Sequence, residues 1–184
     1  CSWKWGRGPI AFSHLFDGET YDANINEKAL RSVYIGGKDL GELRPLTIEK
    51  IARKKVYEPI SIVRLSKGRF VIDFGQNIAG VFEIKLPENM VKGQRITIKA
   101  MEFLKEDGSL FMENLRAAKA TDTYIASGDS RDLKTWSPEF LYHGFRYLEV
   151  EGLELIEIGD IKAIALYTDI DNRSFFKCGN PLIN

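Results

Sequence analysis

Residues 60–74 read Ile-Ser-Ile-Val-Arg-Leu-Ser-Lys-Gly-Arg-Phe-Val-Ile-Asp-Phe and hold two strand-like runs joined by a turn. The runs 60–65 and 69–74 are rich in β-branched and aromatic residues, which favour strands. Lys67 and Gly68 lie between them, and glycine allows the chain to turn sharply. The stretch therefore predicts an antiparallel β-hairpin.

Similar short runs continue along the chain. We expect further strands at 80–86, 95–103, 109–112, 121–125, 145–150, 161–167 and 173–176. Turn residues separate them, and Asp107-Gly108 is the best tight-turn signal because glycine accepts the positive φ of a hairpin turn. No segment has a convincing helical period. The pattern predicts an all-β fold, an antiparallel β-sandwich or jelly roll.

The N-terminal third gives weaker signals. Residues 1–26 look loop-like because glycine and proline interrupt them, whereas 30–35 and 46–57 suggest short strands. Pro59 restricts the residue before it, so we place a boundary near Glu58. We therefore expect a sandwich domain over residues 58–170, a short N-terminal β segment within 1–57, and a separate segment at 171–184.

Composition excludes several classes of function. The 184 residues contain 26 Lys and Arg against 26 Asp and Glu, so no net charge attracts nucleic acid or an anionic membrane. No apolar run is long enough to span a membrane. The chain begins at Cys1 without methionine and shows no signal-peptide pattern, so we expect a shortened or processed chain. Location stays unknown, with the cytoplasm slightly favoured over export.

No known catalytic motif is present. The sequence lacks a Gly-x-Ser-x-Gly elbow, a phosphate-binding loop and a dinucleotide fingerprint. His14 and His143 are the only histidines, which excludes a histidine-rich metal site. Spacing along an all-β chain does not fix how far apart two carboxylates lie, so acid and base roles cannot be assigned.

Two polar stretches are candidate interaction sites. Glu113, Asn114 and Arg116 lie in a loop that leads directly into a strand, which would hold the loop firmly at one end. A second stretch, Tyr142-His143-Gly144-Phe145-Arg146-Tyr147, opens a strand with aromatic rings, an imidazole and a guanidinium. Each stretch either presents polar groups to a partner or pairs its charges internally and only fastens the structure.

A third stretch holds three carboxylates within six positions. Asp17, Glu19 and Asp22 supply oxygen ligands that could bind calcium, although the spacing is not that of an EF-hand loop. Acidic residues around a turn also serve simply as turn formers and surface charges. Calcium is thus a possible ligand but not a required cofactor, and a metal site stays unknown.

Several of these blocks resemble the bacterial α-L-rhamnosidases. The resemblance rests on Asp73-Phe74-Gly75-Gln76-Asn77, on residues 107–110 and 113–124, and on 142–147, in matching order and spacing. Residues 17–23 are similar to the end of a motif in that family's N-terminal domain. Residues 176–184 are similar to the entry to its catalytic domain.

The resemblance implies that this chain is part of a longer bacterial glycoside hydrolase. In that family an (α/α)₆ barrel removes terminal α-L-rhamnose with inversion, using acidic residues that match no position here. No residue of this chain is therefore expected to be catalytic, and the chain alone is expected to be inactive. Residues 1–57 would be the tail of the N-terminal domain, 58–170 an accessory β-sandwich, and 171–184 the linker into the barrel.

The resemblance leaves two functions open. The chain is a structural domain that positions the catalytic barrel, with Glu113 to Arg116 and Tyr142 to Arg146 orienting strands or docking the barrel. Alternatively it is a carbohydrate-binding module for rhamnose or a related glycan, as some members bind rhamnose through calcium. The segment after Asp22 lacks the tryptophan-containing stretch expected there. A structural domain should expose an apolar patch, and a binding module an aromatic platform beside amides or a cation.

Overall fold

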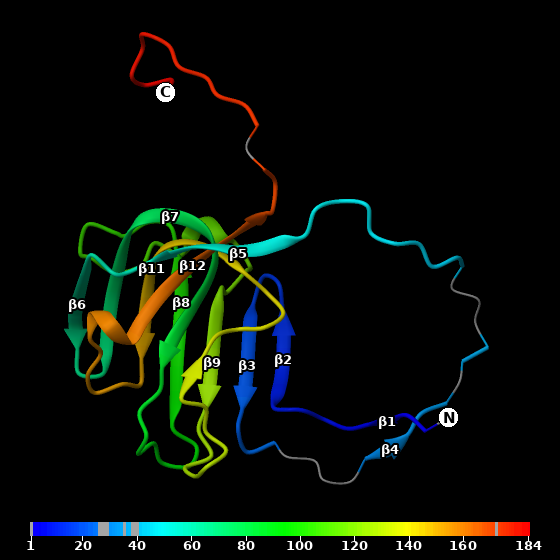
Figure 1. Cartoon of the computed structure of the whole chain (residues 1–184). Coiled ribbons are helices and arrows are strands. Elements are labelled where there is room, and N and C mark those ends of the chain that lie inside the picture. The colour runs from blue at the N-terminus through cyan, green and yellow to red at the C-terminus, as the bar shows by residue number, and fades with distance from the viewer. Residues whose placement is uncertain (1, 26–29, 35, 38–40, 172) are drawn as a thin grey trace.

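The computed structural model describes residues 2–25, 30–34, 36–37, 41–171 and 173–184. Its main sheet has ten strands, shown in Figure 1. The strands are β2 (Ile10–His14), β3 (Gly18–Asp22), β5 (Ile51–Tyr57), β6 (Ser61–Ser66), β7 (Arg69–Lys85), β8 (Arg95–Met101), β9 (Thr121–Ile125), β10 (Thr135–Trp136), β11 (His143–Glu151) and β12 (Ile161–Thr168). Two short strands, β1 (Lys4–Trp5) and β4 (Arg31–Ser32), pair separately.

The sheet follows the order β2-β3-β9-β8-β11-β7-β12-β5 and curls round a common core (Figure 1). The long strand β7 pairs with β6 and β11 near its start and with β12 and β10 near its end. Every pairing in this sheet is antiparallel except that of β3 with β9, which is parallel. These observations confirm the predicted all-β sandwich.

Alternation of side chains explains the core. In β8, Ile96, Ile98 and Ala100 are buried, and the residues between them are more exposed. Phe82 and Tyr124 pack edge-on or tilted against Trp136, which is itself buried. The core therefore lies between the curled parts of the sheet, within residues 70–165 plus Ala23.

Four expectations from the sequence differ from the structure. Residues 1–26 are not all loop, because β2 and β3 form a hairpin whose inner strand joins β9. Residues 109–112 contribute only an isolated bridge between Leu104 and Leu110, and 173–176 form no strand. The expected strand at 30–35 reaches only Arg31–Ser32 among the described residues, and residue 35 lies outside them.

The sheet does not break at the boundary expected near Glu58. Strand β5 pairs with β12, and β3 pairs with β9, so residues before 58 complete both edges of the sheet. A strand edge carries unpaired backbone groups, and β3 and β5 pair with those of β9 and β12, which leaves β2 and β5 as the outer strands. The sandwich as a hydrogen-bonded unit thus includes residues 10–22 and 51–57, whereas the three-part division into domains stays a prediction.

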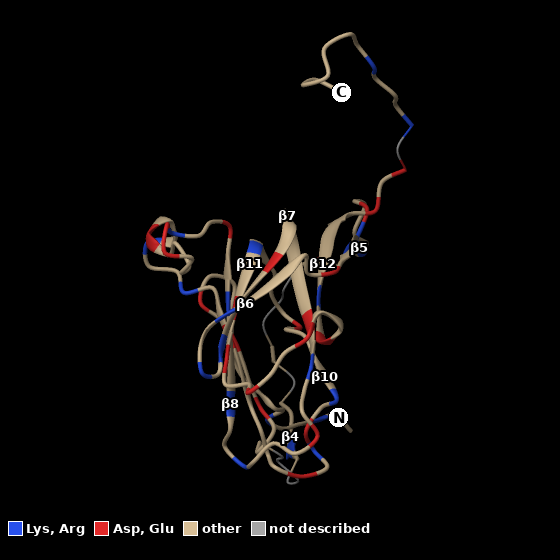
Figure 2. Ribbon diagram, turned by 90° about the vertical axis from the view of Figure 1, so that its left-hand side faces the viewer, with Lys and Arg blue, Asp and Glu red and all other residues tan. Residues whose placement is uncertain are grey.

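Segments outside the sheet extend away from it. Residues 41–50 and 173–184 both lie away from the sandwich in Figure 1. In Figure 2, acidic and basic residues are interspersed over the described part of the ribbon. Over the residues that the structure describes, no helix has the length and apolar character needed to cross a membrane.

Candidate functional site

A pocket lies where the β2–β3 turn meets the loop before β9 and the start of β11. Leu15 and Phe16 come from the turn, Leu115 and Ala118 from the loop, and Tyr142 from the residue before β11. Together with neighbouring residues they line a cavity of about 240 Å³. Its walls are mainly apolar, so it suits an apolar group rather than a highly charged one.

Backbone hydrogen bonds fix the walls of this pocket. The carbonyl of Phe16 accepts hydrogen bonds from the amides of Lys119 and Ala120, at 3.1 and 3.0 Å. The amide of Thr121 donates to the carbonyl of Asp17 at 3.1 Å. The turn and the loop are therefore held together before any partner arrives.

A buried polar cluster of Glu19, Asp122 and His143 adjoins the pocket, which His143 lines. The Nε2 atom of His143 donates to Oδ2 of Asp122 at 2.8 Å, and the amide of Glu19 donates to Oδ1 at 2.8 Å. The Glu19 carboxylate accepts from the amides of Glu139 and Phe140, all at 3.2 Å. All three cluster residues are buried.

Burial dominates the electrostatics of Glu19. Loss of solvent raises the pKa of its carboxyl group, while the amides of Phe140 and Glu139 act in the opposite direction. The nearby carboxylate of Asp122 raises the pKa further. Since neither carboxylate has any exposed surface, this acid pair cannot contact a glycoside. The cluster joins β3, β9 and β11, and it fixes His143, which lines the pocket.

A second polar group lies on β7 and β11. Arg146 donates from Nε and a terminal nitrogen to the two oxygens of Asp73, both at 2.8 Å. This two-pronged contact lowers the pKa of Asp73 below its usual value. Asn77 donates to Glu102 at 2.8 Å nearby. The blocks 73–77 and 142–147, which the sequence singled out separately, are thus joined by an ion pair.

The three predicted residues of the polar loop all lie at exposed positions. Glu113 begins the short 3₁₀ helix η1 (Glu113–Leu115) and pairs with Lys105 at 2.8 Å rather than with Arg116. Asn114 and Arg116 are exposed, and Arg116 has a positive φ of 56°. Of the six predicted docking residues, only Tyr142 and His143 line the pocket.

The three predicted calcium ligands do not converge. Asp17 lies 3.7 Å from Nδ1 of His14, Glu19 is buried, and Asp22 accepts hydrogen bonds from Asn24. Glu19 and Asp22 are three apart on one strand, so they point to opposite faces. Within the described ranges, no three His, Cys, Asp or Glu side chains gather so that they could hold a metal ion. The arrangement does not fit a shared ion, and calcium binding stays a prediction.

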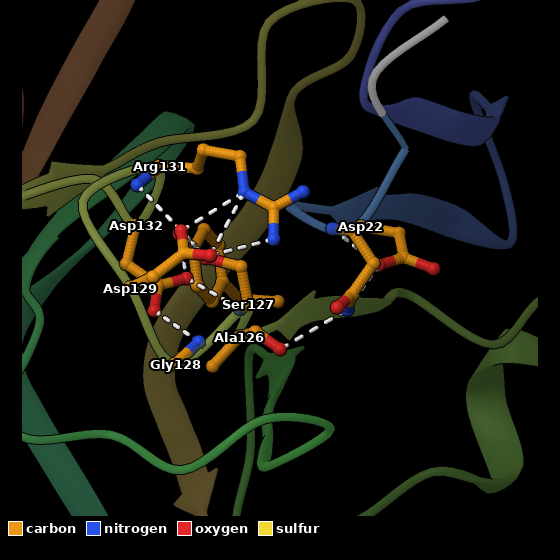
Figure 3. A network of polar contacts seen from close by, with 9 residues as sticks. Asp22, Ala126, Ser127, Gly128, Asp129, Arg131 and Asp132 are labelled. Carbon is orange, nitrogen blue, oxygen red and sulfur yellow. Dashed lines mark hydrogen bonds and ion pairs between the residues drawn. The ribbon is translucent and has the colours of Figure 1, made fainter.

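The loop after β9 has its own polar network, shown in Figure 3. Asp132 accepts from the amides of Ser127 and Gly128 at 2.7 and 2.8 Å, and these bonds outweigh burial and lower its pKa. Arg131 pairs with Asp129 at 2.6 Å. These acids are satisfied by their own loop, so the network is structural.

Sequence reasoning missed Asp122 and the apolar pocket walls. Asp122 is two positions from Tyr124, which is part of the core, so both side chains face inward on β9. A charged residue at an inward-facing position of an expected strand is a pattern that sequence analysis could have detected. Leu15, Phe16 and Ala118 gave no such signal, because only the tertiary fold brings them together.

Comparison with known proteins identifies the fold family. A family model described as the bacterial alpha-L-rhamnosidase concanavalin-like domain matches residues 63–167. The chain belongs to this family. The match covers β7 to β11 in full, and so includes the strands that carry Asp73, Asp122, His143 and Arg146.

Full-length rhamnosidases are similar along the whole chain. An alpha-L-rhamnosidase from Formosa agariphila is 32% identical over 100% of this chain, and this covers 20% of that relative. The structure of the alpha-L-rhamnosidase from Dictyoglumus thermophilum superposes with a TM-score of 0.86 at 32% identity, covering 99% of this chain and 22% of the other. The Streptomyces avermitilis alpha-L-rhamnosidase complexed with L-rhamnose gives a TM-score of 0.82 at 28% identity, covering 96% and 18%. The chain therefore spans about a fifth of the length of these relatives.

Proposed function

We propose that this chain is the non-catalytic β-sandwich portion of an α-L-rhamnosidase, and that it packs against and positions the catalytic (α/α)₆ domain of the same polypeptide. The relatives that match the chain end to end are rhamnosidases about five times as long. The sandwich has a core of its own, and its acid pair is sealed from solvent. These features suit a scaffold better than a reaction centre.

The exposed apolar surface around the pocket carries the proposal. Among the residues that line it, Phe16 is 63% exposed, and Tyr142 and Leu15 are about half exposed. Large apolar side chains that gather on a surface mark an interaction site. A neighbouring domain would remove these side chains from water. The burial of each side chain would favour association of the two domains.

Complementation between separate fragments tests this function. This chain and the remainder of its parent polypeptide are produced separately, and rhamnosidase activity on a chromogenic rhamnoside is measured for each and for the mixture. We expect no turnover by this chain alone and higher, more heat-resistant activity in the mixture. Turnover by this chain that survives repurification, or no association between the fragments, would contradict the proposal.

A carbohydrate-binding module is the second candidate, and the N-terminal tryptophans favour it. Trp3 and Trp5 are exposed, and the guanidinium of Arg31 lies 4.9 Å from the centre of the Trp5 ring. Exposed rings beside a cation can stack on a sugar. Calorimetric titration with L-rhamnose, with and without calcium, tests whether the chain binds this sugar. Heat that disappears in Trp5→Ala supports the module, and its absence in the unaltered chain opposes it.

A further inference from the structure

A buried ionisable cluster fastens the β2–β3 hairpin to the sandwich. The amide of Glu19, on β3, donates to Asp122 on β9 at 2.8 Å. The Glu19 carboxylate accepts from the amides of Glu139 and Phe140, which precede β11. The other oxygen of Asp122 pairs with His143 at 2.8 Å. Glu19 therefore joins the hairpin to two separate parts of the sandwich.

The backbone attaches the hairpin over only a short distance. Strand β3 pairs with β9 in parallel over three residue pairs, and the ring of Tyr21 stacks on that of Tyr124 there. The carbonyls of Phe16 and Asp17 accept further hydrogen bonds from the loop before β9. A short pairing at the margin of a sheet opens locally at a lower free energy than the core does. A change in one buried group can therefore shift the equilibrium between an attached and a detached hairpin.

Two buried glutamates of this chain have opposite surroundings. Glu149 pairs with Arg69 at 2.7 Å and with Lys99 at 3.1 Å. Burial raises the pKa of Glu149, but the hydrogen bonds from its two cations outweigh burial and lower the pKa overall. Glu19 is fully buried, and over the described residues neither it nor Asp122 pairs with a lysine or an arginine. A buried carboxyl group without a cation is costly to ionise.

The carboxylates that face Glu19 add to the effect of burial. Burial raises the pKa of Glu19 most, and the charges of Asp122 and Glu139 raise it further, against the opposing effect of two backbone amides. His143, on β11, contacts the far oxygen of Asp122. On the hairpin itself, His14 and Asp17 lie 3.7 Å apart at the turn. The surroundings of Glu19 thus favour its neutral form.

We propose that Glu19 is a pH-sensitive switch, protonated in the attached hairpin in mildly acidic solution, and that its ionisation at higher pH weakens the attachment of the β2–β3 hairpin to the sandwich. A carboxyl group whose folded-state pKa is raised contributes stability that is fully present below its ordinary pKa of 4.5 and is lost as pH rises through the raised value. The ion pairs of Asp73 and Glu149 have the opposite sign, and their stability is lost on acidification below about pH 5. The two effects therefore fall in separate ranges of pH.

The switch would regulate the proposed docking surface. The turn of the hairpin supplies Leu15 and Phe16 to the pocket, and Leu115, Ala118 and Tyr142 come from the other side of the junction. A detached hairpin would separate these side chains, so the surface is complete only when the hairpin is attached. This step rests on the proposed docking function, whereas the switch itself does not.

Hydrogen exchange on the chain alone tests the switch. The protection of the β3 amides, corrected for the intrinsic exchange rate, is measured at pH 5 and pH 8. We expect protection to fall at least about threefold at pH 8, and to stay the same in Glu19→Gln, whose side chain cannot ionise. Glu88→Gln, at an exposed turn, is the matched control and should follow the unaltered chain. No loss of protection in the unaltered chain, or an equal loss in Glu19→Gln, overturns the switch.

Carbon NMR of the carboxyl groups gives a second test that needs no substitution and holds even where Glu19→Gln does not fold. We expect the carboxyl carbon of Glu19 to titrate above pH 4.5 and that of Glu149 to titrate below it. A Glu19 carboxyl group that titrates at or below pH 4.5 overturns the switch.

Association with the remainder of the parent polypeptide tests the link to docking. Affinity is measured by calorimetry at pH 5 and pH 8 for the unaltered chain and for Glu19→Gln. We expect the fall in affinity at pH 8 to be at least about threefold larger for the unaltered chain. An equal change in both chains overturns the link between the hairpin and docking and leaves the exchange result standing. No association at either pH overturns the docking function, and the exchange result still decides the switch.

Discussion

At the scale of single residues, the ion pair between Asp73 and Arg146 gives a prediction about pH. The hydrogen bonds from Arg146 hold the pKa of Asp73 below its ordinary value of 3.8. A lowered carboxyl pKa contributes stability above the unfolded-state pKa, and that stability is lost as pH falls through the folded-state pKa. Asp73→Asn should therefore be about 1 kcal/mol less stable at pH 7 and should lose less stability than the unaltered chain below about pH 4.

Urea unfolding at pH 7 and pH 3 measures this difference. Glu88→Gln, at an exposed turn, serves as the matched control and should follow the unaltered chain at both values. Identical losses on acidification for Asp73→Asn and the unaltered chain would show that the pair does not contribute.

The same scale shows where sequence reasoning stops. The motif 73–77 and the motif 142–147 were both recognised, but their ion pair depends on the register of β7 against β11, where Tyr147 lies opposite Asp73. The register of two strands depends on which of their faces are buried, and a local sequence pattern does not predict it. Glu149 is a further case, since it is buried and paired with Arg69 at 2.7 Å and Lys99 at 3.1 Å across neighbouring strands.

At the scale of elements, Gly18 decides whether the β2–β3 hairpin can join the sandwich. Its φ is 114°, and a Cβ atom there would lie 1.9 Å from the carbonyl oxygen of Thr121. Gly18→Ala should destabilise the chain by at least about 2 kcal/mol or detach the hairpin from β9. Hydrogen exchange at the amides of β3 measures this. Gly159→Ala, where a Cβ meets nothing within 4 Å, is the control and should change little.

Gly18 also explains why the hairpin was not predicted. In the sequence, glycines and a proline make residues 1–26 look like a loop. In the structure, the glycine lets β3 approach β9 closely, so it permits a strand contact instead of ending a strand. A strand such as β8 was predicted because it buries one alternating face, which is a local signal. The closure of the sheet by β3 is not local.

At the scale of the whole molecule, the apolar surface is unevenly distributed. The sandwich buries its own core, whereas the segments that leave it carry large exposed side chains such as Phe175, at 89%, and Leu182, at 93%. The hydrogen bonds between Cys178 and Asn184 stay within the C-terminal segment. Residues 171–184 therefore contribute little to the free energy of unfolding of the sandwich.

Truncation after Ile170 tests this separation. Phe175, Phe176 and Leu182 bury little surface against the sandwich, so their removal should shift the thermal midpoint by less than about 2 °C. The same truncation should weaken association with the remainder of the parent polypeptide, because we propose that those side chains are covered there. A large fall in the midpoint would show that the segment packs on the sandwich instead. An unchanged midpoint with unchanged association would remove residues 171–184 from the docking surface and leave the pocket around His143 as its centre.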